Sequence, residues 1–489
     1  MNSITRLLAV PVLCLLAGCG APAFSPTPSP NPWADDYSAI TGMDHYKEWG
    51  TYNVHDPSCR KLGDYYYMYS TDAIFHNRRP TESERAMKTG FVQVRRSKDL
   101  VQWEFVGWAF PEIPKEAVEW VRANADGHGA VNIWAPYIIP YGDKYRLYYC
   151  VSAFGRKASY LGLAEASSPE GPWTQVGCVA RTNDATPMNA IDPSVIDDPE
   201  TGRWWMHYGS YFGGLYCVEL NPETGLTLRP GDLGHLTARR ANYRKDNLEA
   251  PEIFFLPETR QYYLFTSYDP LMTTYNVRVG RSAMAPDDFT DFTGQALRDT
   301  TNNFPILTAP YRFAGHPGWA GTGHCCVFQA DGGRYFMAHQ ARLSPQNQQM
   351  VLHVRQLFFL PNGWCAVSPE RYAGTPERTF RTRDLVGDWE IIRVREPLHE
   401  RQTEAGQVLH GEGELQGEEC NVSTLLTLVE NGSWSFDEKR QALTVSLPGG
   451  ETVTDLVVFA GHDWEKEQDT VLFTGLDSHG RSVWGKRVK

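Results

Sequence analysis

The sequence has no pair of cysteines with the Cys-x-x-Cys spacing of zinc fingers, although it contains ten cysteines in 489 residues. Cys14 and Cys19 fall near the N-terminus, and among the other cysteines only Cys325 and Cys326 are neighbours. The spacing excludes a zinc finger and favours buried thiols that act as small hydrophobic side chains. One or two disulfide bonds are the alternative for a chain exported to an oxidising compartment.

Basic residues are in deficit, because 46 Lys and Arg face 58 Asp and Glu, which gives a formal net charge of −12. A net negative chain repels phosphates and uronates, so we predict no nucleic acid among its partners and a neutral substrate. Aromatic residues make up 12% of the chain. Such rings fill strands and cores, and they also offer flat faces on which sugar rings stack.

The apolar run at residues 7–16 is too short to span a bilayer. It follows Arg6 and ends in Leu-Ala-Gly-Cys at residues 16–19, which resembles the lipobox of bacterial signal peptides. We therefore predict a signal peptide with lipobox over residues 1–19, lipidation of Cys19, and a Pro-rich tether over residues 20–32. The expected location is the bacterial cell envelope, on its periplasmic or outer-surface face, with the membrane reached through the N-terminal lipid.

Long helical patterns are scarce apart from a polar stretch around residues 115–123, whereas one hairpin pattern returns five times. Each copy has a short apolar strand, a turn with Gly, Asp or Pro, and a second strand rich in aromatic residues. The copies occupy residues 56–70, 135–149, 192–208, 250–266 and 324–338, and their first residues are Asp56, Ala135, Asp192, Ala250 and His324.

Further strand candidates lie between the copies, and two hairpins per repeat give the four antiparallel strands of a propeller blade. These candidates are residues 90–97, 160–166, 215–220, 275–282 and 352–359. We predict an all-β chain in which residues 33–384 form a five-bladed β-propeller. A β-sandwich is the weaker alternative, because it does not require one signature five times. The first strand of each blade lines the central channel, so the first residues of the five copies are expected to ring one end of it.

The hairpin pattern stops near residue 384. Residues 385–489 show alternating strands at 425–429, 442–447, 453–459 and 470–473 instead. This pattern predicts a separate, small, antiparallel, β-barrel-like C-terminal domain. We expect the chain to be a monomer.

Three acidic residues lie at or beside the starts of copies, since Asp56 and Asp192 open two of them and Glu249 precedes a third. Hydrolysis of a glycosidic bond needs one carboxylic acid that protonates the leaving oxygen and one carboxylate that activates water or attacks the sugar. Carboxylates gathered at one channel mouth repel each other, which costs stability and raises the pKa of one of them. The alternative is structural, because Asp-Pro is commonly a turn, as we expect at Asp198 and Asp269, and a lone Glu is commonly a solvated charge.

Six short segments follow one another through the predicted propeller: VHDPS at 54–58, IWAP at 133–136, NAIDPS at 189–194, YGSYFGG at 208–214, LEAP at 248–251 and GTGH at 321–324. As a set they resemble glycoside hydrolase family 43, and within it the endo-α-1,5-L-arabinanases. The tail from Leu385 more faintly resembles a C-terminal β-domain that some arabinanases carry. The resemblance implies a glycosidase that cleaves α-1,5-L-arabinofuranosyl linkages inside arabinan or arabino-oligosaccharides.

The resemblance also implies a role for each acid. Asp56 is the general base that activates water, Glu249 is the general acid, and Asp192 raises the pKa of that acid and orients it. The implied reaction inverts the anomeric centre, for which acid and base lie roughly 6.5–9.5 Å apart to leave room for water.

Other residues of the matching segments are predicted to bind substrate: His55, Trp134, Asn189, Ser210, Tyr211 and Phe212. For the aromatic ones, core packing is the alternative. The resemblance further implies that His324, supported by His55, holds a calcium ion near the channel axis. One imidazole is a poor calcium site, so water molecules are expected to supply the remaining ligands. The alternative for His324 is a buried histidine satisfied by its neighbours.

Two features depart from the family pattern. Cys325 and Cys326 follow Gly-His where Asn and Ser are usual, and Glu252 stands where an aromatic residue is common. The contacts near the expected ion and the substrate range therefore stay open.

One alternative function is an exo-acting α-L-arabinofuranosidase or β-xylosidase of the same family, although Glu-Ala-Pro at residues 249–251 favours arabinan. Another is a non-catalytic, glycan-binding surface lipoprotein.

Overall fold

The computed structural model describes residues 35–75, 83, 87, 89–240, 246–299, 303–344, 349–397, 401–402, 408–409 and 421–488. The predicted signal peptide, Cys19 and the tether lie outside these residues. The prediction of an all-β chain is confirmed, and the helical elements are few and short: α2 (Lys115–Asn124), α3 (Thr382–Leu385) and the 3-10 turns η1 (Ser38–Ile40), η2 (Met43–His45) and η4 (Asp331–Gly333). In the described part of the chain, no helix has the length and apolar character needed to cross a membrane.

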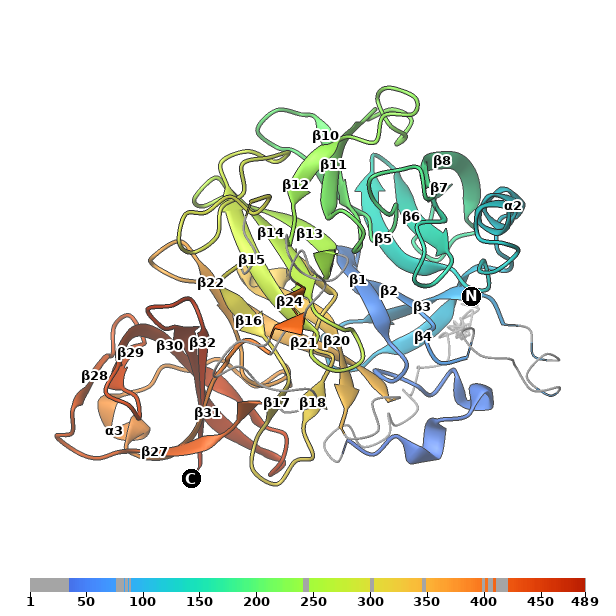
Figure 1. The fold of residues 1–489 in the computed structure, drawn as a ribbon. Coiled ribbons are helices and arrows are strands. Elements are labelled where there is room, and N and C mark those ends of the chain that lie inside the picture. The colour runs from blue at the N-terminus through green and yellow to red at the C-terminus, as the bar shows by residue number, and fades with distance from the viewer. Residues whose placement is uncertain are drawn as a thin grey trace, which may run out of the picture.

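Four sheets of four antiparallel strands each form blades of a β-propeller (Figure 1). The first blade contains β1 (His55–Leu62), β2 (Tyr65–Thr71), β3 (Phe91–Ser97) and β4 (Glu104–Phe110). The second contains β5 (Trp134–Tyr141), β6 (Lys144–Ser152), β7 (Ser159–Ala166) and β8 (Thr174–Thr182). The third contains β9 (Ser194–Asp197), β10 (Trp204–Tyr208), β11 (Leu215–Leu220) and β12 (His235–Ala238). The fourth contains β13 (Leu248–Leu256), β14 (Gln261–Tyr268), β15 (Asn276–Ser282) and β16 (Ile306–Thr308).

The predicted number of five such blades is corrected to four, because the fifth hairpin copy belongs to a larger sheet among the described residues. This sheet has seven strands: β17 (Tyr311–Arg312), β18 (Trp319–Ala320), β19 (Cys325–Gln329), β20 (Tyr335–Leu343), β21 (Met350–Phe359), β22 (Cys365–Val367) and β26 (Asn421–Val422). The cause is a difference in length, since β20 has nine residues and β19 has five. The free end of β20 pairs with β18, which pairs with β17, and β26 joins β17 in parallel.

The first residues of all five hairpin copies share an uncommon left-handed backbone. Their φ angles are 50° at Asp56, 43° at Ala135, 57° at Asp192, 54° at Ala250 and 50° at His324. Residues other than glycine seldom adopt this conformation, because their Cβ atom is crowded there. In β1, β5 and β13 the ladder register also shifts at this point. The five positions are therefore equivalent in structure, as the repeat predicted.

Polar side chains link the innermost strands below these positions. Glu252 of β13 is buried and accepts hydrogen bonds from Ser194 Oγ at 2.7 Å and from the backbone N–H of Val327 at 3.0 Å. Its Oε1 atom also lies 3.4 Å from Arg60 Nη2, and Arg60 donates a hydrogen bond to the hydroxyl of Tyr137. These contacts join β1, β5, β9, β13 and β19 across the centre. Glu252 thus forms buried polar contacts at a position where the family commonly has an aromatic residue.

The C-terminal region forms a second seven-stranded sheet, in the order β27-β23-β32-β31-β30-β29-β28. Its strands are β23 (Gly387–Arg393), β27 (Thr424–Leu428), β28 (Trp434–Asp437), β29 (Ala442–Ser446), β30 (Thr452–Asp463), β31 (Gln468–Leu476) and β32 (Ser482–Arg487). All of its ladders are antiparallel, as predicted, and its outer strands β27 and β28 share no ladder in the described part of the chain. A separate two-stranded ladder joins β24 (Arg401–Gln402) and β25 (Val408–Leu409).

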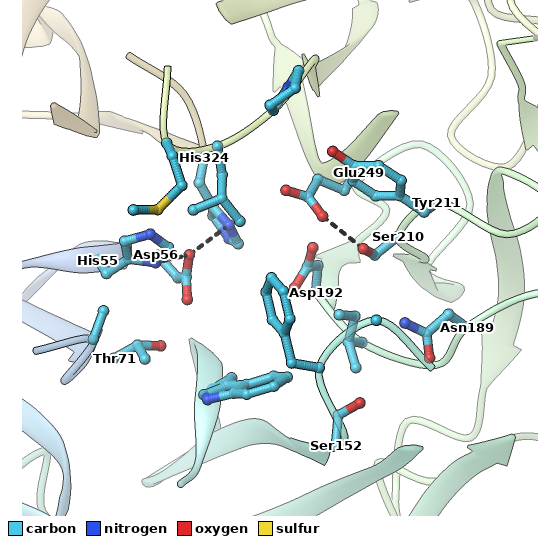
Figure 2. Close-up of a pocket in the computed structure, with 18 of the residues that line it drawn as sticks. His55, Asp56, Thr71, Ser152, Asn189, Asp192, Ser210, Tyr211, Glu249 and His324 are labelled. Carbon is cyan, nitrogen blue, oxygen red and sulfur yellow. Dashed lines mark hydrogen bonds and ion pairs between the residues drawn. The ribbon is translucent and has the colours of Figure 1, made fainter. Parts of the chain in front are cut away.

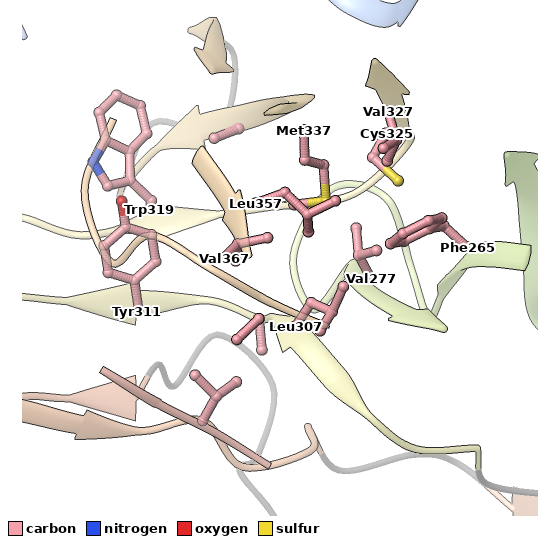
Figure 3. Packing of buried hydrophobic residues seen from close by; sticks show 14 of the residues in the cluster. Phe265, Val277, Leu307, Tyr311, Trp319, Cys325, Val327, Met337, Leu357 and Val367 are labelled. Atoms are coloured by element: carbon pink, nitrogen blue, oxygen red, sulfur yellow. The ribbon is translucent and has the colours of Figure 1, made fainter. Parts of the chain in front are cut away.

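The C-terminal sheet is fixed to the propeller by apolar packing and by polar contacts. One buried cluster spans both parts and includes Trp484 of β32. Tyr311 and Trp319 of the propeller sheet belong to the same cluster (Figure 3). The rings of Tyr311 and Trp484 meet edge to face, with centroids 5.3 Å apart. Lys486 Nζ is buried and lies 2.8 Å from Glu370 Oε1, just beyond β22. One apolar cluster therefore spans the junction, whereas the C-terminal sheet also has a buried cluster of its own around Trp389 and Phe473.

We predict that Glu252→Ala destabilises the propeller by about 3–5 kcal/mol, because it leaves the largely buried Arg60 guanidinium without its carboxylate. Urea denaturation followed by tryptophan fluorescence measures the change. Asp331→Asn is the matched control, since it removes the exposed partner of Lys61, and its unfolding midpoint is expected to equal that of the wild type. Equal midpoints for both variants would contradict the role given to Glu252.

Candidate active site

A cavity of about 1100 Å³ lies at the end of the propeller where the left-handed residues gather. All of the site residues predicted within the described part of the chain line it: Asp56, Asp192, Glu249, His55, Trp134, Asn189, Ser210, Tyr211, Phe212 and His324. They come from segments far apart in the sequence. The propeller therefore brings together every predicted residue except Cys19, which lies outside the described residues.

Asp56 lies on one wall of the cavity between two histidines (Figure 2). Its Oδ1 atom is 2.6 Å from His55 Nδ1 and 2.9 Å from His324 Nδ1, and its backbone N–H donates to Gln340 Oε1 at 2.9 Å. The side chain is nearly buried, which by itself raises the pKa of Asp56, but the two imidazoles outweigh burial and hold that pKa well below its ordinary value. Asp56 is therefore an ionised carboxylate at neutral pH.

The hydrogen bonds of His55 fix its protonation state. Its Nε2 atom lies 3.1 Å from Arg342 Nη2 and 2.8 Å from Gln340 Nε2. A guanidinium can only donate, so Nε2 accepts and carries no proton. Burial lowers the pKa of His55, which keeps the ring neutral, and its single proton is then on Nδ1, which lies 2.6 Å from Asp56 Oδ1.

Glu249 and Asp192 lie across the cavity from Asp56 (Figure 2). Ser210 Oγ donates to Glu249 Oε2 at 2.6 Å, and the backbone N–H of Ala250 donates to Asp192 Oδ2 at 3.2 Å. Burial raises the pKa of Glu249 above its ordinary value, although the Ser210 hydrogen bond offsets part of the effect. Burial also raises the pKa of Asp192, and the nearby charges of Glu249 and Asp56 raise it further, against the opposite effect of His324.

The cavity therefore holds an ionised carboxylate on one wall and, on the other, two acids whose pKa values lie above their ordinary values. Such a difference in pKa is what allows one site to supply both a base and an acid at the same pH. The difference in pKa arises from the neighbouring groups, since two histidines surround Asp56 while Asp192 and Glu249 share a buried wall.

His324 carries a proton in this arrangement. Burial lowers its pKa, but Asp56, Asp192 and Glu249 outweigh burial and raise the pKa of His324 to about 9. A histidine that binds a metal must be neutral, and calcium takes six to eight oxygen ligands. In the described part of the chain, the clusters of three ligand-bearing side chains lie elsewhere, at Glu451, Asp477 and His479 and at Glu370, Asp463 and Glu465. The side chains around His324 do not by themselves fit calcium, so the ion stays a prediction and no step below uses it.

Several lining residues were not predicted from the sequence, and two of them contact predicted site residues. Phe154 is 81% exposed, and its ring meets that of half-buried Trp134 edge to face with centroids 6.5 Å apart. Arg342 lies at the end of β20 and contacts His55. Both belong to a second ring of positions, where the second strand of each hairpin ends, together with Thr71 and Ser152. The spacing of the repeat also relates these second-strand positions to one another, whereas the prediction rested on the first residue of each copy.

Paired carboxyl groups whose pKa values differ in this way are what the hydrolysis of a glycosidic bond requires. The family model for glycosyl hydrolases family 43 matches residues 50–365, and a model described as a C-terminal lipocalin-like domain matches residues 369–485. The chain belongs to glycoside hydrolase family 43.

Individual relatives refine this placement. An extracellular endo-α-(1→5)-L-arabinanase of Thermotoga petrophila is 28% identical over 506 residues, which cover 92% of this chain and 98% of that protein. An extracellular exo-α-(1→5)-L-arabinofuranosidase of Cellvibrio japonicus is 29% identical over 329 residues, which cover 64% of this chain and 85% of that protein. The crystal structure of an endo-1,5-α-L-arabinanase from Thermotoga petrophila aligns with a TM-score of 0.73 at 26% identity, over 90% of this chain and 99% of that one.

We predict that Asp192→Asn makes the protein more stable at about pH 8 while it removes activity. The folded pKa of Asp192 lies above its unfolded value, so its contribution to stability is present below the unfolded pKa and is lost as pH rises through the folded pKa. Asparagine keeps the acceptor for Ala250 N–H and carries no charge. Differential scanning calorimetry is expected to show a higher Tm than the wild type at about pH 8 and no gain at about pH 4.

The control is Asp64→Asn, an exposed aspartate in the β1–β2 turn, for which no gain is expected at either pH. A Tm for Asp192→Asn at or below that of the wild type at the higher pH would show that the acid cluster does not cost stability.

Proposed function

We propose that the protein is an endo-acting, inverting arabinanase that hydrolyses α-1,5-L-arabinofuranosyl linkages of arabinan. The observation that carries the proposal is the ionised Asp56 facing Asp192 and Glu249, whose pKa values burial raises, across one cavity. The endo-acting relative aligns over 92% of this chain, including its C-terminal part, whereas the exo-acting one aligns over 64%. Endo action is therefore favoured over the exo-acting and purely binding alternatives.

In this proposal Asp56 accepts a proton from a water molecule, and the water oxygen attacks the anomeric carbon from the face opposite the leaving group. Glu249 donates its proton to the glycosidic oxygen as the carbon–oxygen bond breaks. Asp192 supports the acid through repulsion between like charges, which keeps the proton on the pair. His55 and His324 keep Asp56 ionised for the next cycle. Proton exchange with solvent then restores both carboxyl groups.

The remaining cavity residues suit a neutral sugar polymer. Trp134 and Phe154 form an aromatic pair at the cavity, and an exposed ring of this kind binds the C–H faces of sugars. Asn189 and Ser210 add polar groups that can bind hydroxyls. The place of Trp134 in the cavity supports sugar stacking by its ring rather than core packing alone.

One polar contact recurs where neighbouring sheets of the propeller meet, and we propose that it orders the sheets around the axis. At two blade junctions, a side chain on the second strand of one blade accepts the N–H of the next left-handed residue: Thr71 for Ala135 and Ser267 for His324. Gln340 on β20 does the same for Asp56 of the first blade. This repeated contact supports a ring in which β20 precedes β1.

We predict that Glu249→Gln and Asp56→Asn each lower kcat on linear arabinan by roughly 10²–10⁴-fold, because each removes one half of the acid–base pair, while oligosaccharide binding is retained. Product analysis of the wild type is expected to show a spread of arabino-oligosaccharides. The control is Glu258→Gln, an exposed acid outside the cavity, with wild-type rates expected. Release of monosaccharide alone would contradict endo action, and binding without new reducing ends would support a glycan-binding protein.

We propose that the protein is exported and lipid-anchored, which the apolar run, the lipobox-like segment and the two relatives described as extracellular support. Cys19→Ala is expected to move the protein from the detergent-rich to the aqueous phase in detergent partitioning, because it removes the acceptor of the lipid. Cys14→Ala is the matched control in the same segment and should stay in the detergent-rich phase. Detergent-phase recovery of the Cys19 variant would argue against the anchor.

A further inference from the structure

Tyr275 lies behind the acid wall of the cavity, at the start of the third strand of the same blade. It immediately precedes β15, and the register aligns Leu248 of β13 with Tyr268 of β14 and then with Asn276 of β15. Because Glu249 follows Leu248 and Tyr275 precedes Asn276, both residues occupy the same end of this sheet. Tyr275 is 1% exposed. It is not among the residues that line the cavity, so the blade holds it beneath the acid.

The ring of Tyr275 is held firmly by the segment before His324. A Cβ atom at Gly323 would lie 2.2 Å from the Tyr275 ring, so the ring packs directly on the glycine backbone. The backbone of Tyr275 is also fixed, because its N–H donates to Pro270 O at 3.1 Å and its carbonyl accepts from Thr322 Oγ1 at 3.2 Å. The absence of a side chain at Gly323 therefore leaves room for this ring.

The Tyr275 hydroxyl is buried and has no partner with full hydrogen-bond geometry among the described residues. A buried hydroxyl without a partner is costly and calls for an explanation. The register places the hydroxyl at the same end of the blade as the Glu249 carboxyl. In keeping with this, burial first and that carboxyl next raise the pKa of Tyr275 well above its usual range, and the Tyr275 hydroxyl in turn acts to lower the pKa of Glu249. The hydroxyl and the carboxyl are thus neighbours that lack an ideal contact in this state.

We propose that Tyr275 is a positioning residue for the general acid, whose hydroxyl donates to the Glu249 carboxylate as that group gives up its proton. This rests on the function proposed above. Negative charge develops on Glu249 when its proton moves to the leaving oxygen, and Ser210 already donates to Oε2 of this carboxyl. Fixed donors directed at a developing charge in a buried site stabilise the transition state more than the ground state. Tyr275 supplies a second such donor, and its hydrogen bond to Glu249 forms fully only when Glu249 has given up its proton.

The test compares two substrates that differ in their need for an acid. Linear arabinan has a poor alkoxide leaving group, which needs a proton from the acid. The second substrate is an aryl α-1,5-arabinotrioside, whose 4-nitrophenolate leaving group departs without protonation. Tyr275→Phe keeps the ring that packs on Gly323 and removes only the hydroxyl. We expect kcat on arabinan to fall about 10- to 100-fold with little change in KM, and kcat on the aryl substrate to fall less than about 3-fold.

A pH profile gives a second readout, since loss of the Tyr275 hydrogen bond is expected to move the alkaline limb of kcat on arabinan to higher pH. The other groups that influence Glu249 are unchanged in this variant: Ser210, Asp192, Asp56, His324 and Tyr211. Tyr263→Phe is the control, because its hydroxyl donates to Gly363 O outside the cavity, and it should behave as the wild type.

Gly323→Ala is the second variant, and because it displaces the ring it should reproduce the substrate-dependent loss. Equal loss on both substrates, or no loss on either, would overturn the role of Tyr275. Wild-type protein that cuts neither substrate would instead overturn the proposed function, and the role of Tyr275 with it. Thermal unfolding of each variant, expected at the wild-type Tm for Tyr275→Phe, separates loss of chemistry from loss of fold.

Discussion

The geometry of the cavity depends on one backbone constraint, the left-handed conformation at the start of each innermost strand. Four of the five residues concerned are also followed by proline, which normally favours an extended conformation in the residue before it. Such a conformation persists only where the surroundings fix it. Here polar side chains accept the N–H groups of Asp56, Ala135 and His324. Strain at the strand ends and support from the neighbouring strand together place the reacting side chains.

The electrostatics of the cavity follow from this placement. One left-handed position carries Asp56 and another carries His324, and their 2.9 Å contact keeps a carboxylate charged in a buried site. A third carries Asp192, whose pKa is raised by burial and by the charges of Glu249 and Asp56, against the effect of His324. The same propeller end therefore contains a carboxylate that is held ionised and a pair of acids whose pKa values are raised. Stability is lost in the second arrangement, and the site gains groups that can both take and give a proton.

Much of the fold and part of the site were predictable from the sequence, for identifiable reasons. The repeat made Asp56 and Asp192 recognisable, because turn residues and aromatic strands recur at fixed spacing around them. Glu249 lies one residue before a repeat start, so the repeat only placed it beside the site, and the family resemblance gave it the role of the acid. The extension of the last sheet was not predictable, since β17 and β18 have two residues each and β26 comes from position 421. Tyr275 was missed because its importance depends on contact with Gly323 and not on sequence spacing.

The polar network centred on Glu252 has a consequence for how a long polymer reaches the site. Arg60, Tyr137, Ser194 and Glu252 fill the axis beneath the acids, so the cavity has a solid floor. A polysaccharide cannot be threaded through the molecule from one end to the other. It has to be laid across the open face sideways, so that a bond far from either terminus is as accessible as one near it, and both fragments leave by the face through which the polymer entered.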